Sequence, residues 1–339
     1  MNMNLLSSTY VFSFFTLLSR ILGYLRDILI AIFLGASIFA DAFFVAFRLP
    51  NTFRRLFAEG TFNAAFIPSY ASIKIENKSS GKKFADEVLS LLVLILFFIV
   101  LLVEIFTPYF VYLIAPGFFA DTQKFNLVVE LTRIMFPFLF FVSIASFFSG
   151  ILNSNNRFAA AAAAPIFLNV LLILSLLVSF YFNLNFVKQL SYAVTLSGII
   201  QCLFLIYFTK KYYISSIKFK TTISRKVKYF FKKLLPSVLS SGVTQVNILV
   251  GTIIASFESS AVSYLYYADR IYQINLALAG IAVGTVSLPV LSKAFKQKNV
   301  SKISNIQTKS LELSLLLSIP ASVGIILISE QIVNALFGY

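Results

Sequence analysis

The sequence predicts an all-α protein whose helices cross a membrane many times. Hydrophobic residues make up 59% of the 339 residues, and charged residues make up only 12%. The mean hydropathy is +0.88, whereas a soluble domain is about 45–50% apolar and about 25% charged. A helix needs about 20 apolar residues to cross a bilayer, so the length allows about ten spans. This composition excludes an ordinary soluble enzyme and a disordered chain.

Nine apolar runs define the predicted spans in chain order. They cover residues 10–34, 39–66, 88–114, 127–152, 158–182, 190–208, 234–257, 262–291 and 311–337. The third and fourth runs are among the most apolar, while the first, second and eighth also contain charged residues. Pro50 lies inside the second run. Because proline removes a backbone hydrogen bond, we expect a kink there.

The basic residues alternate between successive loops. The loops after the second, fourth, sixth and eighth spans carry nineteen Lys and Arg, and the other loops carry only Lys124 and Lys188. Cytoplasmic loops of membrane proteins are enriched in Lys and Arg. We therefore expect a cytoplasmic N-terminus and, after nine spans, an outer C-terminus. The same bias explains the net charge of +15, which would suggest nucleic-acid binding in a soluble protein.

The most basic loop is the predicted domain boundary. Residues 210–233 carry nine Lys and Arg and separate a six-helix N-terminal lobe, residues 1–209, from three further spans, residues 234–339. Within this loop and just after it, apolar residues recur at helical spacing: Val227, Phe230, Phe231 and Leu234. This pattern predicts an amphipathic helix that lies on the cytoplasmic membrane surface.

Missing residue types narrow the possible chemistry. The chain has no His and a single Cys, Cys202, which excludes a Ser-His-Asp triad, a His metal site and an intrachain disulfide. The outer loops offer only Asp121 and Glu258 as acids, so a membrane enzyme acting on polyprenyl phosphates is disfavoured. We expect neither enzymatic activity nor a cofactor or metal.

The remaining seven basic residues are all Arg and lie inside predicted spans: Arg20, Arg26, Arg48, Arg54, Arg55, Arg133 and Arg270. Charge within a bilayer is costly and marks a cavity or a functional site. A guanidinium is a permanent cation whose fork of donors matches phosphate oxygens. The sequence therefore predicts a cavity for an anionic substrate, and in so apolar a chain we expect a lipid or a lipid-linked headgroup.

Helical spacing groups the charges of the first two spans. In the first span Arg20 and Asp27 share a face, as a pair between helices or as part of a substrate site, while Arg26 lies with Ser19. In the second span one face carries a run of four charges: Asp41, Arg48, Arg55 and Glu59. Arg54 points elsewhere, and Arg54 and Arg55 can also extend toward the cytoplasmic surface.

Two further spans carry charges close together in sequence. Glu130 precedes Arg133 by three residues in the fourth span, which predicts an ion pair within that helix. Asp269 and Arg270 are adjacent in the eighth span, where they form either a local pair or part of the substrate cavity.

Four blocks of sequence carry a family resemblance. Ser19–Tyr70, APGF at Ala115, ILNSNNRF at Ile151 and YYADRIYQINLALAGIAVGTVSLPVLSK at Tyr266 resemble the MurJ (MviN) lipid II flippases of the MOP exporter superfamily. The resemblance implies a two-lobe helical transporter of the bacterial inner membrane. It also implies that lipid II, the undecaprenyl-diphosphate-linked peptidoglycan precursor, moves to the outer leaflet by alternating access around a cationic cavity.

The resemblance assigns roles to residues of this chain. The headgroup and its diphosphate would be bound by four arginines: Arg20, Arg26, Arg54 and Arg270. Supporting polar positions in or beside the cavity are Ser19, Asp27, Asp41, Arg48, Asn51 and Glu59. The charge pattern of the second and eighth spans, and not the resemblance, adds Arg55 and Asp269 to this set. We expect a monomeric transporter, driven by a coupling ion or the membrane potential, that works beside cell-wall synthesis proteins.

Other interpretations remain open. The family typically has about fourteen spans and the chain has nine predicted ones, so we expect a fragment, which could be inactive or act as a scaffold. A related exporter of drugs or of another polyprenyl-linked glycan is the main functional alternative. The excess of Arg argues against cationic drugs as the cargo.

Overall fold

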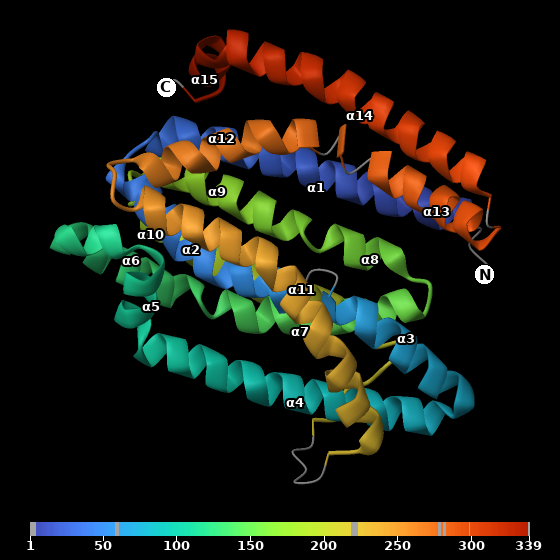
Figure 1. Ribbon diagram of the computed structural model, residues 1–339. Coiled ribbons are helices and arrows are strands. Elements are labelled where there is room, and N and C mark those ends of the chain that lie inside the picture. Colours follow the sequence, from blue (N-terminus) through green and yellow to red (C-terminus); the bar gives the residue numbers. More distant parts are fainter. Residues whose placement is uncertain are drawn as a thin grey trace. The chain divides into compact units, whose positions relative to one another are not determined.

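The computed structural model describes residues 5–57, 61–217, 223–276, 279–280, 283–297 and 299–337. These residues form helices joined by short turns, with no β-strand among them, which confirms the predicted all-α class (Figure 1). The chain divides into two compact units, Met1–Val262 and Ser263–Tyr339. Each unit is described by itself below.

The helices follow one another closely along the chain. Their bounds are α1 Leu5–Leu34, α2 Ile38–Phe57, α3 Thr61–Glu76, α4 Lys78–Ile105, α5 Thr107–Ile114, the 3-10 helix Pro116–Ala120, α6 Thr122–Met135, α7 Phe138–Ser154, α8 Phe158–Ala163, α9 Ile166–Phe182, α10 Phe186–Thr209, α11 Arg225–Ala255, α12 Ala261–Asn275, α13 Val283–Lys296, α14 Val300–Leu327 and α15 Ser329–Phe337.

Five helical stretches among the described residues are long and apolar enough to cross a membrane. They are Lys78–Ile105, Thr122–Ser154, Phe158–Phe182, Phe186–Thr209 and Val300–Leu327. The other predicted spans coincide with α1, α2 and α3, α11, and α12 and α13, which carry more charged or polar residues. The chain is thus a polytopic helical membrane protein.

Prolines divide some predicted spans into two helices. Pro137 and Pro165 immediately precede α7 and α9, where a missing backbone N–H costs little because the first turn of a helix leaves it unbonded. The fourth and fifth predicted spans are therefore each built from two consecutive helices. Pro50, in contrast, lies within α2, which continues through it to Phe57.

The core of the first unit is built around α7, which packs against α10, α3, α4 and α2 (Figure 1). Phe66 of α3 lies at the centre of an aromatic cluster, with ring centroids 5.1 Å from Phe147 of α7 and 6.1 Å from Phe84 of α4. Gly150 lets α7 approach α3, because a Cβ there would lie 2.8 Å from the Phe66 ring. Such aromatic pairs supply a large share of the buried apolar area.

The prediction for the basic segment is wrong in one respect. Residues 213–217 are not helical, and the helix begins at Arg225 and continues as α11 to Ala255. Val227 and Phe230 are fully buried, and Phe230 contacts the rings of Phe62 and Phe84. The apolar face of this segment is therefore covered by α3 and α4 and not by lipid. The division into lobes at residues 210–233 stays a prediction.

Candidate functional site

Arg26 of α1 is buried and held on three of its nitrogens. Its Nε and Nη2 donate to Asp27 Oδ1 at 2.9 and 2.6 Å, and Nη1 donates to Asn169 Oδ1 at 2.9 Å. Arg26 is 8% exposed and Asp27 is 2% exposed. Burying a guanidinium is costly unless an anion and hydrogen-bond acceptors surround it. Both are present here.

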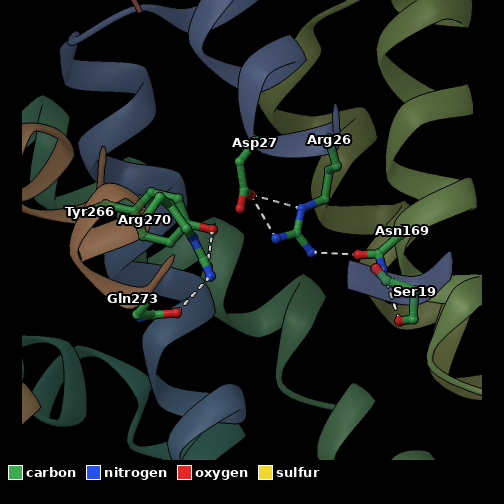
Figure 2. A network of polar contacts seen from close by, with 7 residues as sticks. All are labelled: Ser19, Arg26, Asp27, Asn169, Tyr266, Arg270 and Gln273. Atoms are coloured by element: carbon green, nitrogen blue, oxygen red, sulfur yellow. Dashed lines mark hydrogen bonds and ion pairs between the residues drawn. The ribbon is translucent and has the colours of Figure 1, made fainter. Parts of the chain in front are cut away.

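Asn169 of α9 extends this contact to Ser19, two turns before Arg26 on α1. Its Nδ2 donates to the Ser19 carbonyl at 2.8 Å and lies 3.3 Å from Ser19 Oγ. Gly23, between Ser19 and Arg26, faces the same amide, because a Cβ there would lie 3.6 Å from it. Figure 2 shows the row from Ser19 through Asn169 to Arg26 and Asp27. We call these four residues the α1–α9 network.

The network tests two expectations about the first span. Ser19 and Arg26 do share a face, since both contact Asn169. The Asp27 carboxylate pairs with its chain neighbour Arg26, and a shared substrate face for Arg20 and Asp27 stays a prediction. Arg20 is exposed and makes no hydrogen bond or ion pair with any residue in the part of the chain that the structure describes.

Asp41 of α2 is fully buried in an ion pair with Lys124. Lys124 Nζ lies 2.8 Å from Asp41 Oδ2, and the same ammonium lies 3.8 Å from the ring centroid of Phe118. Lys124 belongs to α6 and is 7% exposed, so it is a buried helical residue where a loop was expected, and its side of the membrane stays a prediction. The pair joins α2 to α6 in a position shielded from water, which favours a structural role for Asp41.

Arg54, near the end of α2, is partly buried beside Asn51. Its Nε and Nη2 donate to Asn51 Oδ1 at 3.0 and 2.9 Å. The two residues are three apart, so they lie on adjacent turns of one helix face. Arg48 and Arg55 are also partly buried. Glu59 lies outside the described residues, so the predicted four-charge face of the second span stays a prediction.

Arg270 belongs to the second unit, in α12. Its Nη2 donates to Tyr266 Oη at 2.6 Å, its Nη1 lies 3.4 Å from Gln273 Oε1, and its guanidinium lies 4.6 Å from the Tyr266 ring centroid (Figure 2). Residues one turn to either side on α12 thus orient the guanidinium. Asp269 is partly buried. The sequence analysis gave Tyr266 no role of its own. Its position four residues before Arg270, one helical turn away, could have indicated this contact.

Glu130 has a different partner from the one expected. Its carboxylate lies 2.6 Å from Lys188 Nζ of α10, while Arg133 is exposed on α6. The intrahelical pair with Arg133 was therefore a wrong prediction. Spacing along one helix does not reveal a cation that a second helix brings nearer, and Lys188 stands at the start of α10.

The acidic residues and the cysteine of the described ranges are spread over several helices. No group of three His, Cys, Asp or Glu residues that could hold a metal ion occurs there. Cys202 is a buried thiol on α10. The arrangement instead presents guanidinium groups on α1, α2 and α12, held by neutral amide or phenol groups and, at Arg26, by a carboxylate.

Comparison with known proteins identifies the family of the chain. The family model described as "Lipid II flippase MurJ" matches residues 30–339. The chain belongs to the MurJ family. A probable lipid II flippase MurJ of Rhizobium tropici is 41% identical over 95% of the chain, and one of Rickettsia prowazekii is 38% identical over 99% of it. The chain spans 61% of the Rhizobium protein and 66% of the Rickettsia protein.

Solved structures agree with the assignment to the MurJ family. A lipid II flippase MurJ in an inward closed conformation matches 97% of this chain and 68% of its own, at 28% identity and a TM-score of 0.81. A MOP superfamily transporter from Pyrococcus furiosus matches with a TM-score of 0.65 at 17% identity. That second likeness shows a shared MOP fold alone.

Two residues of these polar contacts were not predicted from the sequence. Asn169 is the largest omission, because it joins Ser19 to Arg26. Asn169 could have been recognised as the one side-chain amide in the apolar run Ile166–Phe182. Lys124 was the second omission, since its charge was assigned to topology and not to Asp41.

Proposed function

We propose that this chain takes part in moving lipid II from the inner to the outer leaflet of the bacterial inner membrane, as a transporter and not as an enzyme. The observation that carries the proposal is Arg26, a guanidinium buried in a membrane-spanning bundle and held by Asp27 and Asn169. The MurJ family match supports lipid II as the cargo. The activity would be that of a longer protein or of this chain alone.

The four proposed substrate arginines differ in their partners, which suggests an order of engagement. Arg20 is exposed and makes no contact of its own with the described residues, so it would attract a diphosphate first. Arg26 is matched by Asp27, and a phosphate would have to replace that carboxylate or the Asn169 carbonyl. Such an exchange keeps the guanidinium paired throughout, which avoids the cost of a bare buried charge.

Arg54 and Arg270 would also bind the headgroup. Each is oriented by a neutral group, the Asn51 amide or the Tyr266 phenol. A bidentate contact to phosphate needs a guanidinium in a fixed orientation. Ser19, Asn51 and Asp27 would act by holding the arginines, and Asp41 by holding α2 against α6.

We also propose a cytoplasmic N-terminus and coupling to an ion gradient or the membrane potential. Nineteen Lys and Arg in alternate loops, against two in the others, support this orientation. The potential is worth about 2.3 kcal/mol per charge per 100 mV, so a cationic cavity would respond to it. The transporter would act as a monomer, beside enzymes of cell-wall synthesis.

The test of this function is rescue of a flippase-depleted bacterium by the gene that contains this chain. Arg26→Ala and Arg270→Ala should abolish rescue, because each removes a proposed diphosphate contact. Arg157→Ala is the matched control, since Arg157 is exposed in the turn before α8. Normal rescue by both variants, at membrane levels equal to the control, would contradict the proposal.

A related MOP exporter with another cargo is the second candidate. It is supported by the shared fold with a multidrug MATE transporter, matched with a TM-score of 0.63 at 17% identity. The cargo that the protein transports distinguishes the two candidate functions. Drug resistance without rescue of the depleted cells would favour the exporter.

A further inference from the structure

An apolar groove of about 650 Å³ lies on the side of the first unit formed by α9 and α10. Its walls are Leu171, Leu174 and Val178 of α9, Tyr192 and Leu196 of α10, and Ile134 at the end of α6. This volume is within the range of sites that hold small ligands, about 300–1,000 Å³. None of the proposed substrate residues lines the groove.

The groove opens on a surface that faces hydrocarbon. Both of its main walls belong to stretches long and apolar enough to span a membrane, Phe158–Phe182 and Phe186–Thr209. Leu174 and Leu196 are each 48% exposed. In a bilayer these side chains contact lipid tails, so an acyl chain is the ligand of matching chemistry for the apolar part of the groove.

Polar groups are found at one end of the groove. Glu130 lies one turn before Ile134 on α6, and Lys188 lies one turn before Tyr192 on α10. Lys188 Nζ and Glu130 Oε1 are 2.6 Å apart, with the two side chains 41% and 48% exposed. An accessible cation and an accessible anion therefore stand together above the groove, next to the α9–α10 turn.

A second polar feature lies deeper in the groove. Ser175 lines it, and its buried Oγ has no hydrogen-bond partner among the described residues. Gln189 and Thr195 also contribute to the lining. A hydroxyl donor below a pair of charges matches a phospholipid, whose ester carbonyls lie below its headgroup.

We propose that this groove binds one phospholipid with a zwitterionic headgroup and a primary ammonium, namely phosphatidylethanolamine. The lipid ammonium would donate to the Glu130 carboxylate, the phosphate would accept from the Lys188 ammonium, and one acyl chain would fill the groove. The headgroup would thus replace one ion pair by two. An anionic lipid without an ammonium group is disfavoured, because nothing would offset the repulsion between its phosphate and the Glu130 carboxylate. This site does not depend on the proposed transport activity.

Native mass spectrometry of the purified chain tests the site, with phosphatidylethanolamine, phosphatidylcholine or phosphatidylglycerol of identical acyl chains added at matched concentration. We expect phosphatidylethanolamine to bind about tenfold more tightly than phosphatidylglycerol, which is the effect of one charge-assisted hydrogen bond. Glu130→Gln should remove or reverse that preference. Glu258→Gln, at an exposed acid between α11 and α12, should leave it unchanged.

A matched pair of tryptophan variants tests the acyl-chain part of the site. Leu174→Trp fills the groove and should reduce phosphatidylethanolamine binding several-fold. Leu177→Trp is the control, on the same helix and 47% exposed but outside the lining. Equal binding of all three lipids, preference for phosphatidylglycerol, or equal effects of the two tryptophans would each overturn the proposal. Every outcome can be read whether or not the chain transports lipid II.

Discussion

Asn169 is the residue that makes a buried guanidinium on α1 tolerable. Asp27 supplies the counter-charge, the Asn169 carbonyl accepts from Nη1 of Arg26, and the Asn169 NH₂ group donates to Ser19. A side-chain amide is both donor and acceptor, so one residue can serve both ends of the row. An aliphatic residue in this position could make neither of these hydrogen bonds.

Replacing Asn169 by Ala should therefore destabilise the first unit. The loss of the Arg26 and Ser19 contacts predicts a cost of about 1–3 kcal/mol, seen as a lower Tm in detergent. Asn126→Ala is the control, because Asn126 is exposed on α6. If the two variants melt together, the α1–α9 network contributes nothing to stability.

Gly117 is a second position where one residue sets a contact between distant segments. Its N–H donates to Ser256 Oγ at 3.0 Å, and a Cβ at this position would lie 2.3 Å from the Ser256 carbonyl oxygen. The clash is with backbone, so it can be relieved only by moving the 3-10 helix Pro116–Ala120 away from the end of α11.

Gly117→Ala should cost about 1–3 kcal/mol, the usual range for overpacking. Gly324→Ala in α14 is the control, since a Cβ there meets no atom within 4 Å and Ala favours a helix. Thermal unfolding in detergent measures both. A Gly117→Ala protein that melts at the temperature of the control would contradict this packing.

At the scale of elements, the Asp41–Lys124 pair joins α2 to α6. Both groups are buried, so removal of one partner leaves a bare charge in an apolar setting. Lys124→Met should cost about 3–5 kcal/mol, whereas the double variant Asp41→Asn, Lys124→Met should recover much of this. A double-mutant cycle from thermal unfolding measures the coupling. Additive effects would mean that the two charges do not interact.

The segment after α10 is tied to α4 through Asp86. Tyr213 Oη donates to Asp86 Oδ1 at 2.6 Å, and the Ser216 amide donates to the same oxygen at 3.0 Å. Burial, with the Asp86 hydrogen bond as the second cause, raises the pKa of Tyr213 well above its usual range. The phenol therefore remains a donor at every pH at which the protein is handled.

Tyr213→Phe should loosen this segment without unfolding the helices, because only one partly buried hydrogen bond is lost. We expect faster amide hydrogen exchange over residues 210–217 and faster cleavage by trypsin at Lys210 and Lys211. Tyr212→Phe is the control, since the Arg157 guanidinium lies 5.8 Å from its ring centroid and that contact needs no hydroxyl. Identical exchange in the two variants would show that the Asp86 bond does not hold the segment.

The sequence predicted the positions of the helices better than it predicted the contacts between them. Each of the nine apolar runs coincides with one helix or two consecutive helices, because burial in lipid needs only length and apolarity. The partners of Glu130 and Phe230 did not follow, because each depends on which helix lies alongside. Helical spacing describes one helix and contains no information on its neighbour.

At the scale of the whole molecule, charge falls into separate populations. Lys predominates in the predicted loops, while Arg26, Arg54 and Arg270 are oriented by neighbouring side chains. The central claim is that these guanidinium groups bind a lipid-linked diphosphate.

Native mass spectrometry with undecaprenyl diphosphate and undecaprenol tests that claim most directly. The purified chain should retain the diphosphate and not the neutral alcohol. Arg20→Ala should weaken retention of the diphosphate by about tenfold, since a charge-assisted contact is lost, while Arg157→Ala should not. Equal retention of the two lipids, or undiminished diphosphate binding by Arg20→Ala, would contradict the account.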